Sequence, residues 1–454
     1  MPEQADAKDP KRVCIFTTFD SFSPAYSLCR IAVDQIKMLV AGGYHPTVIV
    51  QDGFEPVGPF AFPEVTLKYI PNVACHNEVK KDETFDEDVD AIEAALSEIL
   101  KDIDVVISHD VIYQNAALKH NFASRRVAKK MPNLLWLHWI HSATSPVTLN
   151  ALRPIFTDAY LELVQTPFPN SLYVFFNDYS VPRVARDFGV DQEKVRVVHH
   201  PSDIGEVLGL TKDVKKFAQE KGLYQKDVVS VYPCRLDRGK QVEMVIKTVA
   251  MLKDFDLSVV VIVVDFHSTG GAKLTYRDEL KNIAIDWGLN SEELIFTSEA
   301  NEDWGTELPY EDTMAIMRLG NVFIQASKSE SYSLITQEAG ILKNVVVLNQ
   351  DFPPFRDIFG PDPIYKKYSS NFDVQADLAE GTGNTNTEYG PENASPDERK
   401  EHEKKYHRGT AGLINTRLKH PEMAFSTRLR KHRSLEAIFK KELEPLFFSE
   451  VKNG

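Results

Sequence analysis

Two short segments of the chain place charged side chains at the start of a helix. In the first, Ser230 to Ala250, a strand-like run ends at Arg235 and Lys240 opens an amphipathic helical pattern. Cations in the first turn oppose the helix dipole at about 0.3–1 kcal/mol each, and a bound anion removes that conflict. The fork of an Arg and the point charge of a Lys together suit a diphosphate. The alternative is a solvated charged loop with Asp237 as the partner.

The second segment, Val322 to Leu348, has the order strand, short loop, helix, strand. Ser333 is a candidate N-cap for this helix. The first N–H groups of a helix have no partner within it, so those of Leu334, Ile335 and Thr336 would form an anion site.

Two glutamates frame the start of this second helix. Glu330 lies in the loop, and Glu338 lies eight positions later, within the helix. A carboxylate accepts hydrogen bonds from vicinal hydroxyls, so Glu338 is a candidate ligand for a ribose and Glu330 for a hexose. This spacing is not specific by itself. The alternative is one surface glutamate and one that solvates the helix.

Strand-like runs alternate with helical patterns in two series, which is typical of parallel βαβ units. The first series predicts strands at 13–16, 47–50, 65–70, 105–107, 134–139, 172–176 and 195–198. After a polar stretch at 202–226, the second series predicts strands at 228–232, 257–264, 293–296, 322–324 and 345–348. Helices are predicted at 240–253, 273–287, 311–318 and 333–342 of the second series. Two doubly wound α/β domains bind ligands at the carboxyl ends of their strands.

The domain boundaries follow from these series. We expect an N-terminal domain over 1–203, a C-terminal domain over 204–423 and a C-terminal helix over 424–454 that packs back toward the N-terminal domain. Residues 370–405 are polar and rich in Gly, Asn, Pro and Glu, which predicts a long surface insertion.

Composition excludes several classes of protein. With 52 Lys+Arg against 66 Asp+Glu the net charge is −14, which disfavours non-specific binding to nucleic acids or membranes. The four cysteines show no C-x-x-C spacing, which argues against a disulfide framework or a zinc site. No run approaches the roughly 20 apolar residues of a membrane span, and the polar N-terminus lacks a secretory signal. We therefore expect a cytoplasmic protein.

The two charged segments resemble the GT-B glycosyltransferases, in particular family four of the retaining nucleotide-sugar enzymes. The family's G-R-L-x-x-x-K-G is matched from Cys234 to Gln241, with these two residues in place of glycines. Its P-S-x-x-E-G-F-G-x-x-x-x-E-A is matched from Ala326 to Ala339, where Ser331 and Ser333 replace glycines. The resemblance covers most of the chain and includes two N-terminal motifs, at 43–48 and 196–203.

The resemblance implies a fold, a reaction and roles for the residues. The expected fold is α/β and consists of two doubly wound Rossmann-like domains, which face a central cleft, and a C-terminal helix. The N-terminal domain would bind the acceptor and the C-terminal domain the donor, a nucleotide diphosphate sugar used as co-substrate. A hexosyl or pentosyl group would pass to an acceptor hydroxyl with retention, without a required metal. Arg235 and Lys240 would neutralise the leaving diphosphate, and Glu330 and Glu338 would bind the transferred sugar and the ribose.

Family members also carry a histidine that faces the donor sugar. His138 and His141 both fit that position, and His141 is favoured because it follows the predicted strand, whereas His138 falls within it. Either residue is alternatively a structural histidine. Asp88 and Asp90 mimic a D-x-D metal motif, but they belong to an acidic helical run that is more typical of a solvated face.

Other functions stay open on the sequence. Basic residues gather at 119–130 and 417–433. Such clusters are usually solvated helix faces, and the alternative is a binding surface for a polyanionic acceptor, including DNA with hydroxymethylated bases. A nucleotide-sugar epimerase, a phosphorylase and a non-catalytic nucleotide-sugar-binding protein are further alternatives. The nucleotide base, the sugar and the acceptor are left undetermined.

Overall fold

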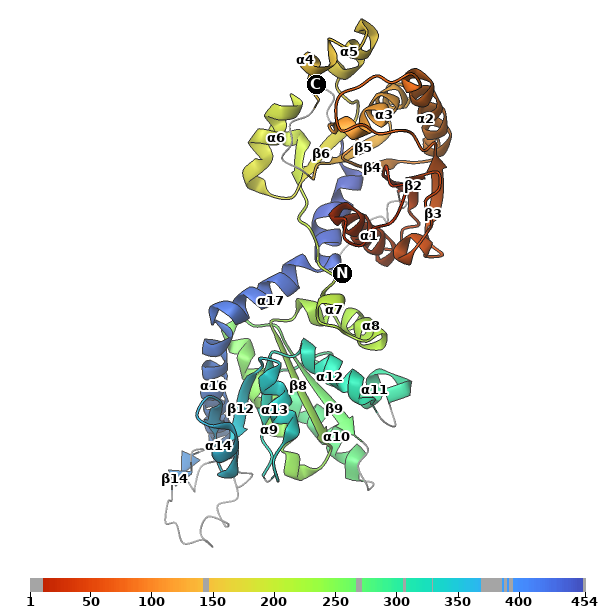
Figure 1. The fold of residues 1–454 in the computed structure, drawn as a ribbon. Coiled ribbons are helices and arrows are strands. Elements are labelled where there is room, and N and C mark those ends of the chain that lie inside the picture. The colour runs from red at the N-terminus through yellow and green to blue at the C-terminus, as the bar shows by residue number, and fades with distance from the viewer. Residues whose placement is uncertain are drawn as a thin grey trace, which may run out of the picture. The chain divides into compact units, whose positions relative to one another are not determined.

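The computed structural model describes residues 11–141, 147–266, 272–304, 308–328, 330–368, 386–387, 390–391 and 395–451. The chain divides into two compact units (Figure 1). The first unit comprises Met1–Asp203 and Arg433–Gly454, and the second comprises Ile204–His432. The chain thus returns to the first unit at Arg433 rather than at Ala424.

The first unit is built on a seven-stranded parallel sheet of order β3-β2-β1-β4-β5-β6-β7. Its strands are β1 Val13–Phe16, β2 Thr47–Gln51, β3 Thr66–Ile70, β4 Val105–His109, β5 Leu135–Trp139, β6 Ser171–Phe175 and β7 Val195–Val197. The helices that connect them are α1 Ser27–Ala41, α2 Phe85–Leu100, α3 Leu118–Lys130, α4 Leu149–Leu152, α5 Asp158–Gln165 and α6 Val181–Phe188. The central strands β1, β4, β5 and β6 are buried along their whole length, because a parallel sheet is covered on both faces.

Alternate residues of β1 enter two separate apolar clusters of the first unit. Val13 and Ile15 pack in a cluster with α1, whereas Cys14 and Phe16 pack in a cluster with α2 and α3. This alternation follows from the two-residue period of a strand. The two clusters therefore lie on opposite faces of the sheet.

The C-terminal tail is not one continuous helix. Helix α17, Pro421–Arg433, ends before Ser434, whose side chain caps α18, Leu435–Ile438. Phe425 lies on the exposed surface of α17. Only beyond Ser434 does the tail join the core of the first unit, through Ile438, Phe439, Leu443, Leu446 and Phe447.

Phe439 of the C-terminal tail packs against Gly42 at the end of α1. A Cβ atom on Gly42 would lie 2.3 Å from a ring atom of Phe439. Glycine at this position leaves room for the ring, so the Gly-Gly stop of α1 serves the packing of the tail as well as the helix end.

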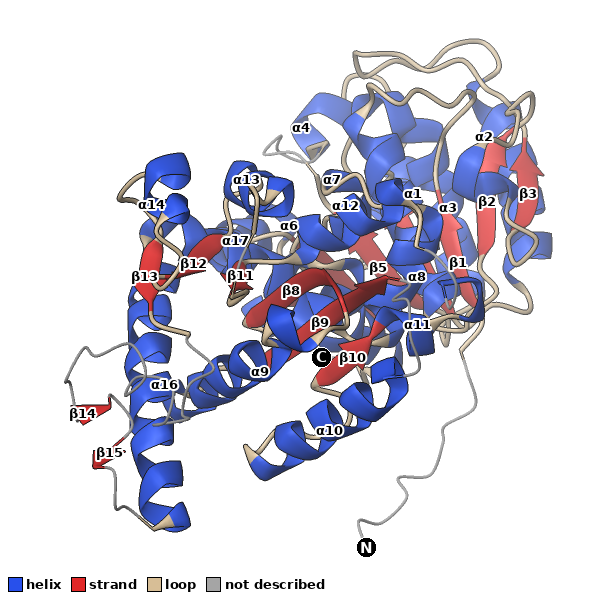
Figure 2. Cartoon of the chain, turned by 90° about the horizontal axis from the view of Figure 1, so that it is seen from below, coloured by secondary structure: helices blue, strands red, loops and turns tan. Residues whose placement is uncertain are grey.

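The second unit has a six-stranded parallel sheet of order β10-β9-β8-β11-β12-β13. Its strands are β8 Val228–Arg235, β9 Val259–Phe266, β10 Leu294–Phe296, β11 Val322–Gln325, β12 Val345–Asn349 and β13 Ile364–Lys366. Its helices include α7 Ile204–Val207, α8 Lys212–Glu220, α9 Val242–Ala250, α10 Ala272–Asp286, α11 Thr297–Ala300, α12 Tyr310–Leu319, α13 Leu334–Ile341 and α14 Pro354–Phe359. Helix α9 lies against β9 and α10 against α9 (Figure 2). The strand order reverses between β8 and β11, and such switch points are where open α/β sheets bind ligands.

The predicted insertion at 370–405 is wrong in its last part. Residues 396–405 belong to α16, Pro396–Leu418, which begins with a capping box between Ser395 and Glu398. This helix is polar on nearly all sides and buries few residues, so its composition resembles that of a loop. The earlier part of the insertion lies outside the described residues, apart from the short pair β14 Asn386–Thr387 and β15 Gly390–Pro391.

Two parallel α/β units and a C-terminal helical segment confirm the predicted fold class, which is typical of GT-B enzymes. Within the part of the chain that the structure describes, no helix has both the length and the apolar character needed to cross a membrane.

Candidate functional site

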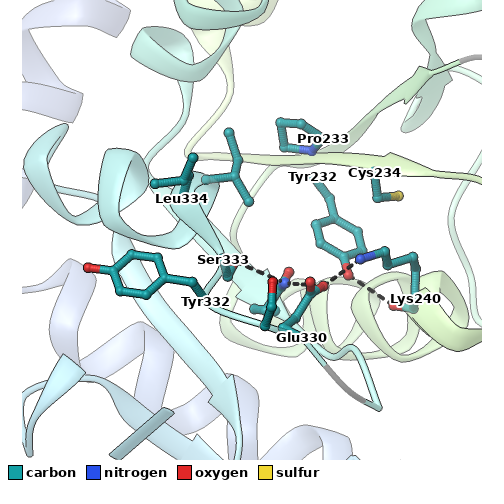
Figure 3. Close-up of a pocket in the computed structure, with 11 residues that line it drawn as sticks. Tyr232, Pro233, Cys234, Lys240, Glu330, Tyr332, Ser333 and Leu334 are labelled. Carbon is teal, nitrogen blue, oxygen red and sulfur yellow. Dashed lines mark hydrogen bonds and ion pairs between the residues drawn. The ribbon is translucent and has the colours of Figure 1, made fainter. Parts of the chain in front are cut away.

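A cavity of about 510 Å³ opens at the carboxyl ends of β8 and β11 in the second unit (Figure 3). The cavity brings the two charged segments together, because Lys240 of the first segment contacts Glu330 of the second although they are 90 positions apart in the sequence. The residues that line it are Tyr232, Pro233, Cys234, Lys240, Gln325, Glu330, Ser331, Tyr332, Ser333, Leu334 and Ile335.

An ion pair between Lys240 and Glu330 crosses the cavity. Lys240 Nζ lies 2.5 Å from Glu330 Oε1, and the two side chains are only 19% and 16% exposed. Gln325 Nε2 donates to the same carboxylate oxygen at 2.9 Å. The carboxylate is therefore held by a cation and an amide at once.

Tyr232 fixes the loop that carries Lys240. Its hydroxyl donates to the backbone carbonyl of Lys240 at 3.0 Å and lies 3.1 Å from Ser327 Oγ. Burial raises the pKa of Tyr232 well above its usual value, so the phenol stays protonated. This buried donor keeps the lysine at the cavity wall.

The first residues of α13, Leu334 and Ile335, line the cavity. Ser333 stands at the N-cap position, but its side chain makes no capping bond, and its carbonyl accepts the N–H of Thr336 at 3.1 Å. Ser333 Oγ instead contacts Thr336 Oγ1 at 2.8 Å and accepts a bond from Gln325 Nε2 at 3.2 Å. The expectation of three free N–H groups is thus wrong for Thr336, and the anion site at Leu334 and Ile335 stays a prediction.

Two residues that replace the family's glycines keep a glycine-like backbone. Ser333 has φ 72° and Gln241 has φ 48°, in the left-handed region that costs a side-chain-bearing residue roughly 1–2 kcal/mol. Ser333 lines the cavity, and Gln241 directly follows Lys240, which also lines it. Both positions thus keep the left-handed turn that glycine adopts most readily, at a cost in strain.

Arg235 and Glu338 do not line the cavity. Arg235 ends β8 with its side chain 67% exposed, and its Nε lies 3.9 Å from Asp237 Oδ2. Glu338 accepts a hydrogen bond from the Tyr310 hydroxyl at 2.8 Å. The structure therefore brings Lys240 to the start of α13 but leaves Arg235 in solvent.

His141 belongs to the first unit and follows β5, as its position in the sequence predicts. His138 is fully buried within β5 and lies 2.9 Å from Ser108 Oγ through Nδ1, so it is a structural histidine. His141 Nε2 lies 2.9 Å from His109 Nδ1. Burial lowers the pKa of His141 to about 2, so its imidazole is neutral.

Two of the basic residues at 119–130, Lys119 and Arg126, form ion pairs within the first unit. Lys119 is 4% exposed and pairs with Asp82 at 2.8 Å and Asp88 at 2.7 Å. Arg126 pairs with Asp90 at 2.6 Å. Lys119 and Arg126 thus neutralise the D-x-D pair and are themselves occupied.

The basic residues near the C-terminus are similarly engaged. Arg430 is buried and donates to the backbone carbonyls of Leu223 and Lys226, and Lys431 pairs with Asp227. Two central cations of this cluster thus serve the fold, which weakens the case for a DNA acceptor. Among the residues described here, no three His, Cys, Asp or Glu side chains gather to hold a metal ion.

Several residues that shape these sites were not predicted from the sequence. Gln325 and Tyr232 organise the cavity, and Gln35 and His109 contact His141 or its partner. Gln325 and His109 both end strands, and a polar residue at the carboxyl end of a buried strand was the signal that could have found them.

No protein-family model matches the chain, and no curated protein matches it. The chain is similar to solved structures of glycosyltransferases over nearly its whole length. A glycosyltransferase from Rickettsia africae is 12% identical over 97% of this chain and 98% of that one, with a TM-score of 0.33. HepE from Anabaena, in complex with UDP-glucose, is 14% identical over 96% and 97%, with a TM-score of 0.31. A UDP-forming trehalose-phosphate synthase from Burkholderia xenovorans is 13% identical over 96% and 99%, with a TM-score of 0.33. Likeness at this level carries no argument about activity, which has to come from the cavity itself.

Proposed function

We propose that this chain is a glycosyltransferase that moves a hexosyl or pentosyl group from a nucleotide diphosphate sugar to an acceptor hydroxyl. One observation carries the proposal: Lys240, Glu330 and the first residues of α13 line the same cavity. A cation and helix-terminal N–H groups bind a diphosphate. A carboxylate beside them accepts hydrogen bonds from a sugar.

The diphosphate is the group that this cavity stabilises. When it binds, Lys240 Nζ exchanges Glu330 for a phosphate oxygen, and the N–H groups of Leu334 and Ile335 donate to the same anion. Negative charge on the diphosphate grows as the glycosidic bond breaks, and donors already fixed in place lower the barrier to that step. Arg235, whose nearest carboxylate is 3.9 Å away, adds a second cation by turning toward the phosphates.

Glu330 binds the transferred sugar and Glu338 binds the ribose. Glu330, once released by Lys240, binds hydroxyls of the transferred sugar while Gln325 keeps its carboxylate oriented. Glu338 binds the ribose in place of the Tyr310 hydroxyl. His141 binds a sugar hydroxyl, and the first unit binds the acceptor. Retention and the acceptor role of the first unit rest on the family resemblance alone.

A nucleotide panel tests the proposal. The full chain is heated with the diphosphates of uridine, guanosine, adenosine and cytidine, and one of them should stabilise it. At 100 times the Kd, the expected stabilisation is about 2.7 kcal/mol. If none of the four raises the unfolding temperature, the cavity is not a donor site and the proposal fails.

Product analysis then separates the proposed reaction from its rivals. The sugar nucleotide of the base that binds is incubated with and without candidate acceptors. Transfer or slow hydrolysis releases the nucleoside diphosphate. An epimerase instead leaves the nucleotide sugar intact in a new configuration, and a phosphorylase requires inorganic phosphate for turnover.

A further inference from the structure

Three histidine rings stand in a row at the carboxyl edge of the sheet in the first unit. His109 ends β4, His141 follows β5 and His200 follows β7. The ring centroids of His109 and His141 are 5.1 Å apart with an interplanar angle of 16°, and those of His141 and His200 are 6.0 Å apart at 2°. The row follows the strand order, so it is a product of the sheet.

Hydrogen bonds connect two of these rings to helix α1. Gln35 Oε1 lies 2.8 Å from His109 Nε2, and His109 Nδ1 lies 2.9 Å from His141 Nε2. An amide oxygen only accepts, so His109 Nε2 carries the proton in this contact. A neutral His109 then has a bare Nδ1, which accepts the proton of His141 Nε2. A neutral His141 in turn has a bare Nδ1.

Both rings are neutral in the folded chain. His109 is 2% exposed, and burial lowers the pKa of His109 to about 3 and that of His141 to about 2. The nearby carboxylate of Asp110 accepts the backbone N–H of His141 at 3.2 Å and the side chain of Gln114 at 2.8 Å. In these contacts Asp110 accepts from the backbone of His141 and not from its ring. The tautomer of the His141 ring is therefore set by His109.

We propose that Gln35 and His109 are positioning residues that hold His141 as the tautomer with a bare Nδ1, so that His141 accepts a hydrogen bond from a sugar hydroxyl. His141 Nδ1 is buried and has no hydrogen-bond partner within the described part of the chain. A bare nitrogen attracts a hydroxyl and repels a carboxylate or phosphate oxygen, which brings no proton. The inference rests on the proposed function and adds a preference for a neutral, hydroxyl-bearing group at this point of the substrate.

Nitrogen NMR of the histidine rings tests the tautomer without any substrate. In the full chain labelled with ¹⁵N-histidine, two-bond ¹H–¹⁵N correlations distinguish a protonated from a bare ring nitrogen. His141→Phe assigns the His141 signals. We expect bare Nδ1 and protonated Nε2 in His141, and protonated Nε2 in His109. A protonated Nδ1 on His141, which the reverse orientation of the Gln35 amide would produce, overturns the proposal.

Two variants then break the connection at different points. His109→Phe keeps a stacked ring without hydrogen bonds, and Gln35→Met keeps volume without an acceptor, which offers a second route if the first variant folds poorly. In both, the His141 signals should move to a mixture of tautomers. His138→Phe is the matched control, because it removes a buried histidine of β5 that bonds to Ser108 rather than to His141. Unchanged His141 signals in both test variants would refute the positioning role.

Activity supplies a separate readout. In His109→Phe and Gln35→Met, kcat/KM for transfer should fall roughly tenfold, the effect of one misdirected hydrogen bond in a buried site. The stabilisation by nucleoside diphosphate should not change, because that ligand binds to the second unit. If no diphosphate binds to the wild type, the proposed function fails whatever the tautomer. If diphosphate binds and transfer proceeds at full rate in both variants, only the positioning role fails.

Discussion

Replacing Lys240 by methionine and, separately, Glu330 by glutamine should change diphosphate affinity in opposite directions. The two side chains share one ion pair of 2.5 Å across the cavity. Diphosphate binding must break that pair, so Glu330 competes with the ligand for Lys240. Lys240→Met removes the cation, whereas Glu330→Gln removes its competitor.

The sizes of the two effects follow from the contacts. A hydrogen bond to a charged group contributes about 1.5–3 kcal/mol, so Lys240→Met should weaken diphosphate binding roughly 10- to 150-fold. Glu330→Gln removes the cost of breaking the ion pair. If the pair contributes about 1 kcal/mol, the upper end of the range for exposed ion pairs, the affinity for diphosphate should rise about fivefold. Transfer should nevertheless be lost in Glu330→Gln, because the sugar loses its carboxylate.

Titration calorimetry with the nucleoside diphosphate selected by the thermal panel measures both effects. Lys247→Met is a matched control. Lys247 forms a 2.5 Å ion pair with Glu403, and those side chains are 14% and 16% exposed, but neither lines the cavity. The control should lose stability without losing affinity.

Two results would refute this reasoning. One is Lys240→Met binding diphosphate as tightly as the Lys247→Met control, which would mean that the cation does not contact the phosphates. The other is Glu330→Gln binding diphosphate more weakly than the wild type, which would place the carboxylate on the nucleotide rather than in competition with it.

Further predictions concern strain, burial and pH. Ser333 and Gln241 have φ angles of 72° and 48°. At each position the glycine variant should have a free energy of unfolding about 1 kcal/mol higher than that of the alanine variant, measured by urea denaturation. An alanine variant as stable as the glycine variant would show that the backbone is not strained there. Arg430→Met should destabilise the chain by at least about 3 kcal/mol, because backbone carbonyls of the second unit lose their charged donor; a smaller loss in the same assay would show that water replaces the guanidinium. Burial lowers the pKa of His138 and of His407 to about 3. The unfolded chain therefore takes up protons first, and stability that is complete above about pH 6.5 is lost as the pH falls toward 3. At pH 5 each of these histidines should lower the free energy of unfolding by about 2 kcal/mol relative to neutral pH. In His407→Leu, the loss of unfolding free energy between neutral pH and pH 5, measured by urea denaturation, should be smaller by that amount. An unchanged loss would contradict the lowered pKa of His407.

Much of the fold was predictable because its strands carry a strong local signal. Val259–Phe266 reads VVVIVVDF, and a continuous apolar run of this kind is typical of a strand buried on both faces. The errors fell where local composition and tertiary packing disagree. Polar α16 looked like a loop, and the break at Ser434 interrupts a tail with a helical pattern throughout.

The sequence by itself determined which residues carry charge and where the strands end, because side-chain type and the length of an apolar run are local properties. A parallel sheet collects the carboxyl ends of its strands at one edge, so these ends were the candidate positions for a site. Only the tertiary structure decided which of those ends meet. Lys240 reaches Glu330 across 90 positions because the chain crosses over to lay β11 beside β8. Gln35 reaches His109 across 74 positions because α1 packs beside the end of β4. Arg235 shows the converse, since its motif placed it at the strand end but its exposed side chain lies outside the cavity. Contacts between distant segments depend on the order of the strands and the direction of each side chain, and no local pattern in the sequence encodes either.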